Sequence, residues 1–243
     1  MKIKINSKPI NIALTGVDPY NGNRGVGALA YSALYLIDSI SKKSNQDISI
    51  FIIVDSITKA EDNFIIGNSV IKVKFIKQIN FLSSRGFIKC LLSPSVINAY
   101  LKMDCILDIS AGDSFSDIYG ANRFKTINVP KRVFRFLCKR QILLPQTVGP
   151  FTNRKIKKDA CKSIESCETV LVRDNLSYEF VVKNTRQKNV FELIDVAFFM
   201  PHKKKEFKKA HIHVGMSISA LLWRGGYNHK NQFGLRLDYP KTI

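Results

Sequence analysis

Five short polar clusters in the sequence each follow an apolar run that is typical of a buried strand. They are Asn23-Arg24-Gly25, residues 111–117 (AGDSFSD), residues 145–150 (PQTVGP), Arg173-Asp174 and Asp195. In an open parallel sheet, ligands bind where the carboxyl ends of the strands meet, so such clusters would share one edge. Loops are polar in most proteins, yet five clusters on one rim favour a binding cleft.

Arg173 is the most informative of these residues. An arginine that ends a buried strand is unfavourable unless it meets an anion or a carboxylate, so we expect a bound phosphate or carboxylate beside it. Asp174 follows directly. It could line the cleft, or it could cap the helix that contains Ser177.

Asn23-Arg24-Gly25 precedes a predicted helix, and the N–H groups at a helix N-terminus favour phosphate or sugar oxygens. The same three residues could also be only the turn that this helix needs. The glycines at 16, 22, 25 and 27 do not form the dinucleotide-binding pattern G-x-G-x-x-G.

Gly112-Asp113-Ser114 is also similar to the block that carries the nucleophile of some serine esterases. That chemistry needs an Asp three residues before a His, and none of the four histidines, at 202, 211, 213 and 229, has one. His211 and His213 would face the same side of a strand, a spacing that metals can use, but no third ligand is evident. We therefore expect neither a metal nor a cofactor.

The elements that must position these residues alternate between strand and helix. Strand-like apolar runs lie at 10–15, 48–54, 70–76, 105–109, 141–144, 169–172 and 190–194. Helix-length segments lie between most of them, at 26–42, 121–138, 153–166 and 175–183. This alternation predicts an α/β fold with a largely parallel sheet that helices cover on both faces.

The composition is that of a globular protein, with 45% hydrophobic residues, but it is strongly basic. There are 38 Lys and Arg against 19 Asp and Glu, which gives a formal net charge of +19. Phosphorylated small molecules, acidic lipid headgroups and nucleic acid are all suitable partners for such a charge. The segment 131–140 (KRVFRFLCKR) could lie on an acidic membrane, or it could bury its aromatic side in the core.

The five cysteines form no C-x-x-C pair and lie mostly in apolar runs, so we interpret them as reduced core residues of a cytoplasmic protein. No segment approaches the ~18 apolar residues of a membrane span. Any membrane contact would be peripheral, at the inner face of the membrane.

The composition of the sequence changes after residue 200. A basic stretch, 201–209 (PHKKKEFKK), precedes a fresh apolar run at 212–218 that is typical of a strand. Fewer residues remain after it than the ~40 that usually fold without cross-links. We predict an N-terminal domain at 1–200, a basic linker at 201–210, and an incomplete start of a second domain at 211–243.

Six segments in the correct order resemble the polysaccharide pyruvyl transferase family: NRGVGALAYSAL, DISAGDSFSDIYG, LLPQTVGPF, VLVRDNLSYEF, IDVAFFM and HVGMSISALLWRGGY. The resemblance implies two Rossmann-like domains, arranged as in two-domain glycosyltransferases, with the active site between them. It also implies transfer of a carboxyvinyl group from phosphoenolpyruvate to sugar hydroxyls of a cell-surface glycan precursor. The products are a pyruvate ketal and phosphate, and the acceptor is a sugar or a lipid-linked glycan.

Within this resemblance, Arg173 matches an Arg-Asp motif and is the expected donor ligand, with Arg24 as a second candidate. Asp113, Asp117 and Gln146 could orient the acceptor hydroxyls, and one aspartate could act as general base. The other residues predicted to bind substrate are Asn23, Gly25, Gly112, Ser114, Asp174, Ser177 and Asp195.

The chain also departs from the family pattern. Val26 stands where many members have an acidic residue, and Ala111-Gly112-Asp113 stands where many have three glycines. The family's Arg-x-His motif in the second domain, which supplies a catalytic histidine, has no counterpart, so we expect little or no turnover by this chain. Two alternatives remain: a non-catalytic basic module that binds an acidic membrane or, less expected, nucleic acid, and a nucleotide-sugar glycosyltransferase of similar fold.

Overall fold

The computed structural model describes residues 8–84, 86, 88, 92–204, 212, 214–226, 229–231 and 234–243. Its contacts divide the chain into two units, Met1–His202 and Lys203–Ile243. This division falls within the stretch 201–210 that the sequence marks as a linker. The assignment of 211–243 to a second domain stays a prediction.

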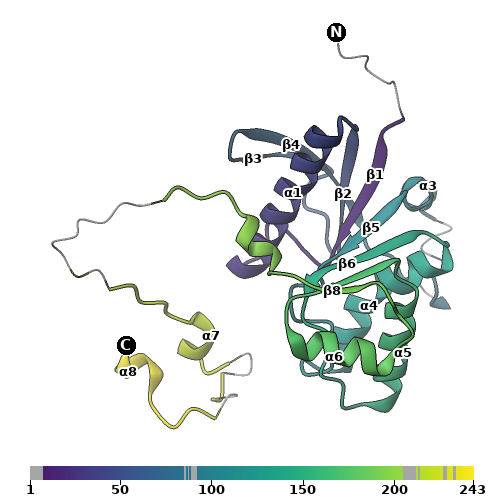
Figure 1. Cartoon of the computed structure of the whole chain (residues 1–243). Helices are drawn as coiled ribbons and strands as arrows, with labels where there is room; N and C mark the ends of the chain where they lie inside the picture. Colours follow the sequence, from purple (N-terminus) through teal and green to yellow (C-terminus); the bar gives the residue numbers. More distant parts are fainter. Residues whose placement is uncertain are drawn as a thin grey trace. The chain divides into compact units, whose positions relative to one another are not determined.

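The first unit is built on one eight-stranded sheet with the strand order β3-β4-β2-β1-β5-β6-β7-β8 (Figure 1). The strands are β1 (Ile10–Thr15), β2 (Ile48–Val54), β3 (Glu61–Ile66), β4 (Ser69–Lys77), β5 (Cys105–Asp108), β6 (Arg140–Gln146), β7 (Thr169–Val172) and β8 (Val190–Glu192). All neighbours pair in parallel except β3 and β4, which are antiparallel. The predicted α/β fold with a largely parallel sheet is confirmed.

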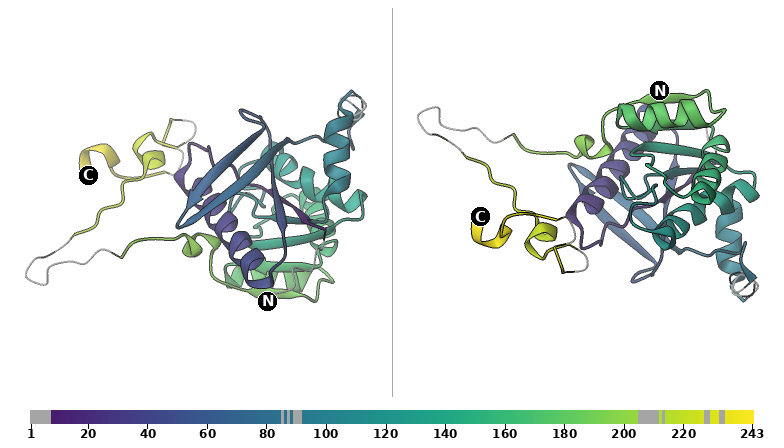
Figure 2. Two further views of the ribbon diagram at one scale, coloured as in Figure 1. Left: turned by 90° about the horizontal axis from the view of Figure 1, so that it is seen from above. Right: turned by 90° about the horizontal axis from the view of Figure 1, so that it is seen from below.

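Helices cover both faces of this sheet (Figures 1 and 2). They are α1 (Arg24–Ser44), α3 (Pro94–Lys102), α4 (Ala121–Phe136), α5 (Arg154–Glu165), α6 (Asn175–Asn184) and the short 3-10 helix η1 (Val196–Phe199). Leu14 and Ile52 pack in the cluster of α1 and η1, whereas their neighbours Ala13 and Ile53 pack in the cluster of α3 and α4. Burial on both faces explains why these strands are apolar throughout.

The strand order places a topological switch point between β1 and β5. From β1 the chain moves outward through β2 to β4, then crosses to β5 on the other side of β1 and continues through β6 and β7 to β8. Loops that follow β1 and β5 therefore run away from each other over the carboxyl edge. In doubly wound sheets, the crevice that opens there is where ligands bind.

The sequence does not predict β3, the antiparallel edge strand. It begins with Glu61, Asp62 and Asn63, which have low β-propensity. Only one of its faces is buried, with Phe64 and Ile66 packed in the core, so it lacks the continuous apolar run that marks the other strands. Helix α3 is likewise absent from the prediction.

The predicted strand at 212–218 is wrong for the part of it that the structure describes. Residues 212 and 214–218 form no strand, and the apolar side chains at 212, 214, 216 and 218 are between 55% and 95% exposed. A strand needs a neighbour that pairs its N–H and C=O groups, and no strand occurs among the described residues of this second unit. His211 and His213 lie outside the described residues.

The second unit contains two short helices, α7 (Ala220–Trp223) and α8 (Tyr239–Thr242). Ser219 caps α7 by accepting a hydrogen bond from Leu222 N, and its own N–H donates to the Tyr239 hydroxyl at 3.1 Å. These contacts link α7 to α8.

The first half of the basic segment 131–140 packs in the core. Lys131, Val133 and Phe134 are buried within α4, so the core alternative holds for this part of the segment, although Phe136 is exposed. In the described part of the chain, no helix has both the length and the apolar character that crossing a membrane requires.

The described cysteines differ in burial, which predicts different reactivity. Cys167 is buried and Cys138 is exposed, so the expected core location is right for the first and wrong for the second. Burial raises the pKa of Cys167 to about 12. Because the thiolate is the nucleophile, we expect iodoacetamide to alkylate native Cys138 more than about a hundredfold faster than Cys167.

Peptide mapping by mass spectrometry measures each cysteine separately, including Cys90, which lies outside the described residues. Urea-unfolded protein is the control, in which Cys138 and Cys167 should react at similar rates. Equal rates in the native protein would contradict the buried position of Cys167.

Candidate functional site

The loop that follows β5, residues 110–114, lies at the switch point and is here called the site loop. Ser110, Ala111 and Gly112 all have left-handed backbone conformations, with φ of 50°, 54° and 85°. Residues other than glycine adopt this region rarely and only where their surroundings impose it. Here Ala111 N donates to Gly16 O at 2.6 Å and Thr147 N donates to Gly112 O at 2.8 Å, so the loops after β1 and β6 hold the site loop from both sides.

A buried charged network lies directly below the site loop. Lys131 Nζ and Asp108 Oδ1 are 2.7 Å apart, with side chains only 1% and 3% exposed. Asp108 also accepts hydrogen bonds from Thr15 Oγ1 at 2.7 Å and Ser110 Oγ at 2.5 Å. Lys131 donates to Ser110 Oγ at 2.7 Å. The first residue of the site loop is thus anchored to both members of a buried ion pair.

Gln146, predicted to orient an acceptor, belongs to this network. Its side chain is fully buried, and Nε2 donates to Asp108 O at 3.0 Å. Asp108 and Lys131 are absent from the predicted site. Asp108 is a carboxylate inside the apolar run 105–109, which is a usable signal, whereas nothing in KRVFRFLCKR distinguishes Lys131 from the other basic residues.

Arg173 meets a carboxylate, which is one of the two expected ways of satisfying it. Its Nη1 lies 2.5 Å from Asp195 Oδ2, and its Nε donates to Thr147 Oγ1 at 2.9 Å. A Cβ on Gly112 would lie 3.1 Å from Arg173 Nη1, so glycine allows the guanidinium to lie against the site loop. No hydrogen bond engages Nη2 within the described residues, and the side chain is 28% exposed.

Asp174 and Ser177 fasten the loop after β6 to helix α6. Asp174 Oδ1 accepts from Ser177 N at 2.8 Å, which is the capping arrangement, and Oδ2 accepts from Thr147 Oγ1 at 3.0 Å. The buried Ser177 hydroxyl accepts from Val148 N at 2.8 Å. Thr147 therefore connects Arg173 with Asp174.

The two predicted catalytic aspartates have different surroundings. Asp117 Oδ2 accepts from Thr152 N at 2.9 Å and from Asn153 N at 2.7 Å. Burial alone would raise the pKa of Asp117, but the hydrogen bonds from Asn153 and Thr152 outweigh it and lower this pKa below its usual value. Asp113 accepts one short hydrogen bond, from the Tyr119 hydroxyl at 2.6 Å, and a weak contact from Ser114 Oγ at 3.5 Å. Among the described residues, Asp113 thus keeps more free acceptor positions for a ligand hydroxyl than Asp117 does.

Asn23, Arg24 and Gly25 begin helix α1 and are exposed. Asn23 Oδ1 caps the helix by accepting from Gly25 N at 2.9 Å. Arg24 makes no ion pair with any residue that the structure describes. The geometry therefore contains the turn that the helix needs and leaves Arg24 available to a ligand.

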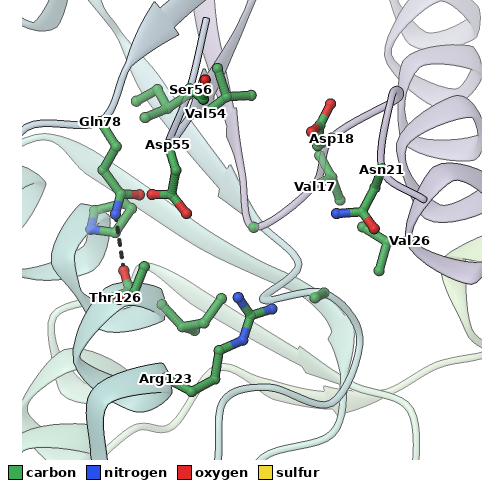
Figure 3. A pocket seen from close by; sticks show the side chains of 15 residues that line it. Val17, Asp18, Asn21, Val26, Val54, Asp55, Ser56, Gln78, Arg123 and Thr126 are labelled. Atoms are coloured by element: carbon green, nitrogen blue, oxygen red, sulfur yellow. Dashed lines mark hydrogen bonds between the residues drawn. The ribbon is translucent and has the colours of Figure 1, made fainter. Parts of the chain in front are cut away.

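A pocket of about 190 Å³ lies between the ends of β1, β2 and β5, and we call it the switch-point pocket (Figure 3). Its polar lining includes Asn21, Asp55, Gln78 and Arg123. Arg123 Nη2 also donates to Ser114 Oγ at 3.3 Å, which joins this pocket to the site loop. In the part of the chain that is described, no three His, Cys, Asp or Glu side chains are grouped so as to hold a metal ion.

None of these four polar residues belongs to the site predicted from the sequence. Asp55 directly follows β2, and Gln78 directly follows β4, so the rule that finds the other polar clusters also applies to them. Arg123 lies within a helix, where only its position in the first turn, close to the predicted site block, is a signal.

A mostly parallel sheet with charged side chains, a strained loop and a pocket at its switch point defines a doubly wound α/β protein, the class in which ligands bind at that edge. The model of the polysaccharide pyruvyl transferase family matches residues 31–239, so the chain belongs to this family. Membership confirms the resemblance and indicates a transferase of polysaccharide biosynthesis. Among curated proteins, no match to the chain was found.

Proposed function

We propose that this protein binds phosphoenolpyruvate beside the site loop, as the donor of a carboxyvinyl group for sugar hydroxyls of a glycan precursor, and that turnover by this chain is low. The observation that carries the proposal is the pair of arginines that flank this loop. Arg123 contacts Ser114 at one end of it, and Arg173 lies against Gly112. Phosphoenolpyruvate has a phosphate and a carboxylate, and guanidinium groups bind both kinds of oxyanion through paired hydrogen bonds.

The two arginines differ in how strongly they are already paired. Arg173 has Asp195 as its partner and offers the donor its free Nη2 edge. Arg123 has no carboxylate within ion-pair distance among the described residues, and its one hydrogen-bond partner is the neutral Ser114 hydroxyl. Arg123 therefore contributes an uncompensated positive charge, and Arg173 contributes a fixed hydrogen-bond donor. Arg24, at the start of α1, is a further candidate for the same anion.

The reaction fixes what the remaining groups must do. One sugar hydroxyl adds to C2 of phosphoenolpyruvate while C3 gains a proton, the bond from C2 to the phosphate oxygen breaks, and a second hydroxyl closes the ketal. Each hydroxyl must lose its proton, which requires a general base. We assign this role to Asp113, which is half-buried and accepts only one short hydrogen bond from the described residues, that of Tyr119. Asp117, whose oxygens are held by residues 152–153, positions the loop instead.

Calorimetric titration of the full chain with phosphoenolpyruvate tests the proposal. Arg123→Gln should weaken binding about tenfold or more, because a hydrogen bond to a charged group is worth roughly 1.5–3 kcal/mol. Arg173→Lys keeps the charge next to Asp195 but loses the planar fork, so it should weaken binding as well. Arg186→Gln is the matched control. Arg186 is exposed and precedes the edge strand β8, whereas the site loop follows β5 in the middle of the sheet.

Three outcomes would contradict the proposal. Arg123→Gln and Arg186→Gln could bind phosphoenolpyruvate equally well. Nucleotide sugars could raise the melting temperature where phosphoenolpyruvate does not, which would favour a glycosyltransferase. Duplex DNA or anionic vesicles could bind with a steep salt dependence while phosphoenolpyruvate has no effect, which would favour a basic binding module.

A further inference from the structure

The switch-point pocket contains hydrogen-bonding groups that no other residue satisfies in the part of the chain that the structure describes. Asn21 Oδ1 accepts from Asn23 N at 2.9 Å, which leaves its NH₂ group directed into the pocket (Figure 3). Within the described residues, the Asp55 carboxylate has neither a hydrogen-bond donor nor a cation beside it. Its oxygens and the Arg123 guanidinium both point towards the middle of the pocket (Figure 3). The Asn21 amide donor, the Asp55 carboxylate acceptor and the Arg123 guanidinium thus converge from the loop after β1, the loop after β2 and helix α4.

The charges that line the pocket leave no excess of positive charge inside it. Asp18 and Asp55 contribute two negative charges and Arg123, at the border with the site loop, contributes one positive charge. A neutral ligand with many hydroxyls would pair with each of these groups without a Coulomb penalty, and the anionic donor would reach Arg123 from the side of the site loop. Carboxylates accept from hydroxyls, and amide and guanidinium N–H groups donate to them.

The size and the wall chemistry narrow the ligand further. A pocket of about 190 Å³ has room for one sugar ring. The nonpolar walls are aliphatic, from residues such as Val26, Val54 and Ile127. None of the described residues that line the pocket is aromatic, so it offers no ring on which a nucleobase could stack.

We infer that the switch-point pocket binds one neutral monosaccharide ring, the ring of the acceptor that receives the carboxyvinyl group. The inference rests on the proposed function for the identity of the reaction. The sugar site shares Arg123 with the proposed donor site, whereas Asn21 and Asp55 belong to the sugar site alone. Ala111 of the site loop lines the pocket, and Arg123 joins the pocket to Ser114. A hydroxyl of a bound ring would therefore lie next to the loop where the donor binds and where Asp113 is the base.

Saturation-transfer NMR with methyl β-glycosides of glucose, galactose, mannose and N-acetylglucosamine tests this inference on the full chain. At least one glycoside should give a signal with the natural sequence, and Asp55→Asn should reduce that signal more than fivefold. The variant is isosteric, and Asp55 is exposed, so folding should be unaffected. Asp47→Asn is the matched control, because Asp47 is an exposed aspartate at the other end of the same strand, β2.

Phosphoenolpyruvate affinity, measured on the same samples, separates this inference from the proposed function. We expect Asp55→Asn to lose the glycoside signal and to keep phosphoenolpyruvate affinity. Glycoside binding without phosphoenolpyruvate binding would overturn the proposed donor and leave the sugar site standing. Phosphoenolpyruvate binding without any glycoside signal, equal signals in Asp55→Asn and Asp47→Asn, or loss of both ligands in Asp55→Asn would overturn the sugar site.

Discussion

Replacement of Lys131 by methionine is expected to lower the free energy of unfolding by about 3–5 kcal/mol, because it removes one partner of a buried ion pair. Methionine fills a similar volume, so the loss is electrostatic and not a cavity effect. The Asp108 carboxylate, 3% exposed, would remain in the core without its cation. Its hydrogen bonds from Thr15 and Ser110 reduce this penalty but supply no charge. Urea denaturation followed by circular dichroism measures the change.

A surface ion pair on the same sheet provides the control. Arg140 forms a bidentate pair with Glu168 at the other end of β6, and both side chains are exposed. Water screens that pair, so Arg140→Met should leave the midpoint of urea unfolding almost unchanged. If Lys131→Met were as mild as Arg140→Met, the buried pair would not stabilise the fold.

A double variant identifies the source of the loss. Asp108→Asn combined with Lys131→Met removes both charges, so its destabilisation should be smaller than the sum of the two single variants by about 0.5–3 kcal/mol. Additive effects would mean that Lys131 acts through its packing on Phe115, over whose ring its ammonium lies at 4.5 Å from the centroid.

The fold is predicted well wherever a strand is buried on both faces. Strands β2 and β7 have the predicted bounds, 48–54 and 169–172, because runs of β-branched and other apolar residues have no alternative to a core position. The edge strand β3 is not predicted from the sequence, because its exposed face is as polar as a loop. The run at 212–218 fails in the opposite way: its alternation is correct for a strand, but a strand also needs a neighbour, and one segment of sequence does not specify that neighbour.

The candidate site is predicted in position but not in pairing. Polar residues gather at the carboxyl ends of parallel strands, and this rule places Arg173 at the edge where it lies against the site loop. Its partner Asp195 comes 22 residues later, so the two meet only when the chain folds. Lys131 and Asp108 form their pair over a similar separation. Local pattern can indicate that a charged residue needs a partner, but only the topology determines which carboxylate meets which cation.

Replacement of Gly16 by alanine is expected to lower the free energy of unfolding by about 2–5 kcal/mol, from left-handed strain and steric overlap together. Gly16 has a φ of 71°, and a Cβ at this position would lie 2.3 Å from Ser110 N and 2.6 Å from Ser110 Cα. Both of these atoms are backbone, so no side-chain rotation can relieve the contact. The loops after β1 and β5 would have to move apart, which would also break the hydrogen bond from Ala111 N to Gly16 O.

Two other glycines divide this effect into its causes. Gly22→Ala lies in the same loop, has open space around its Cβ and needs no left-handed backbone, so it should leave stability unchanged or slightly improved. Gly67→Ala has a φ of 60° and only ordinary contacts, at 3.6 Å or more, around its Cβ, so it measures the strain of positive φ alone. Urea midpoints should fall in the order Gly22→Ala, Gly67→Ala, Gly16→Ala. Because Gly16 and Ala111 both line the switch-point pocket, Gly16→Ala should also abolish glycoside binding. A Gly16→Ala protein as stable as Gly67→Ala would show that the two loops are free to separate.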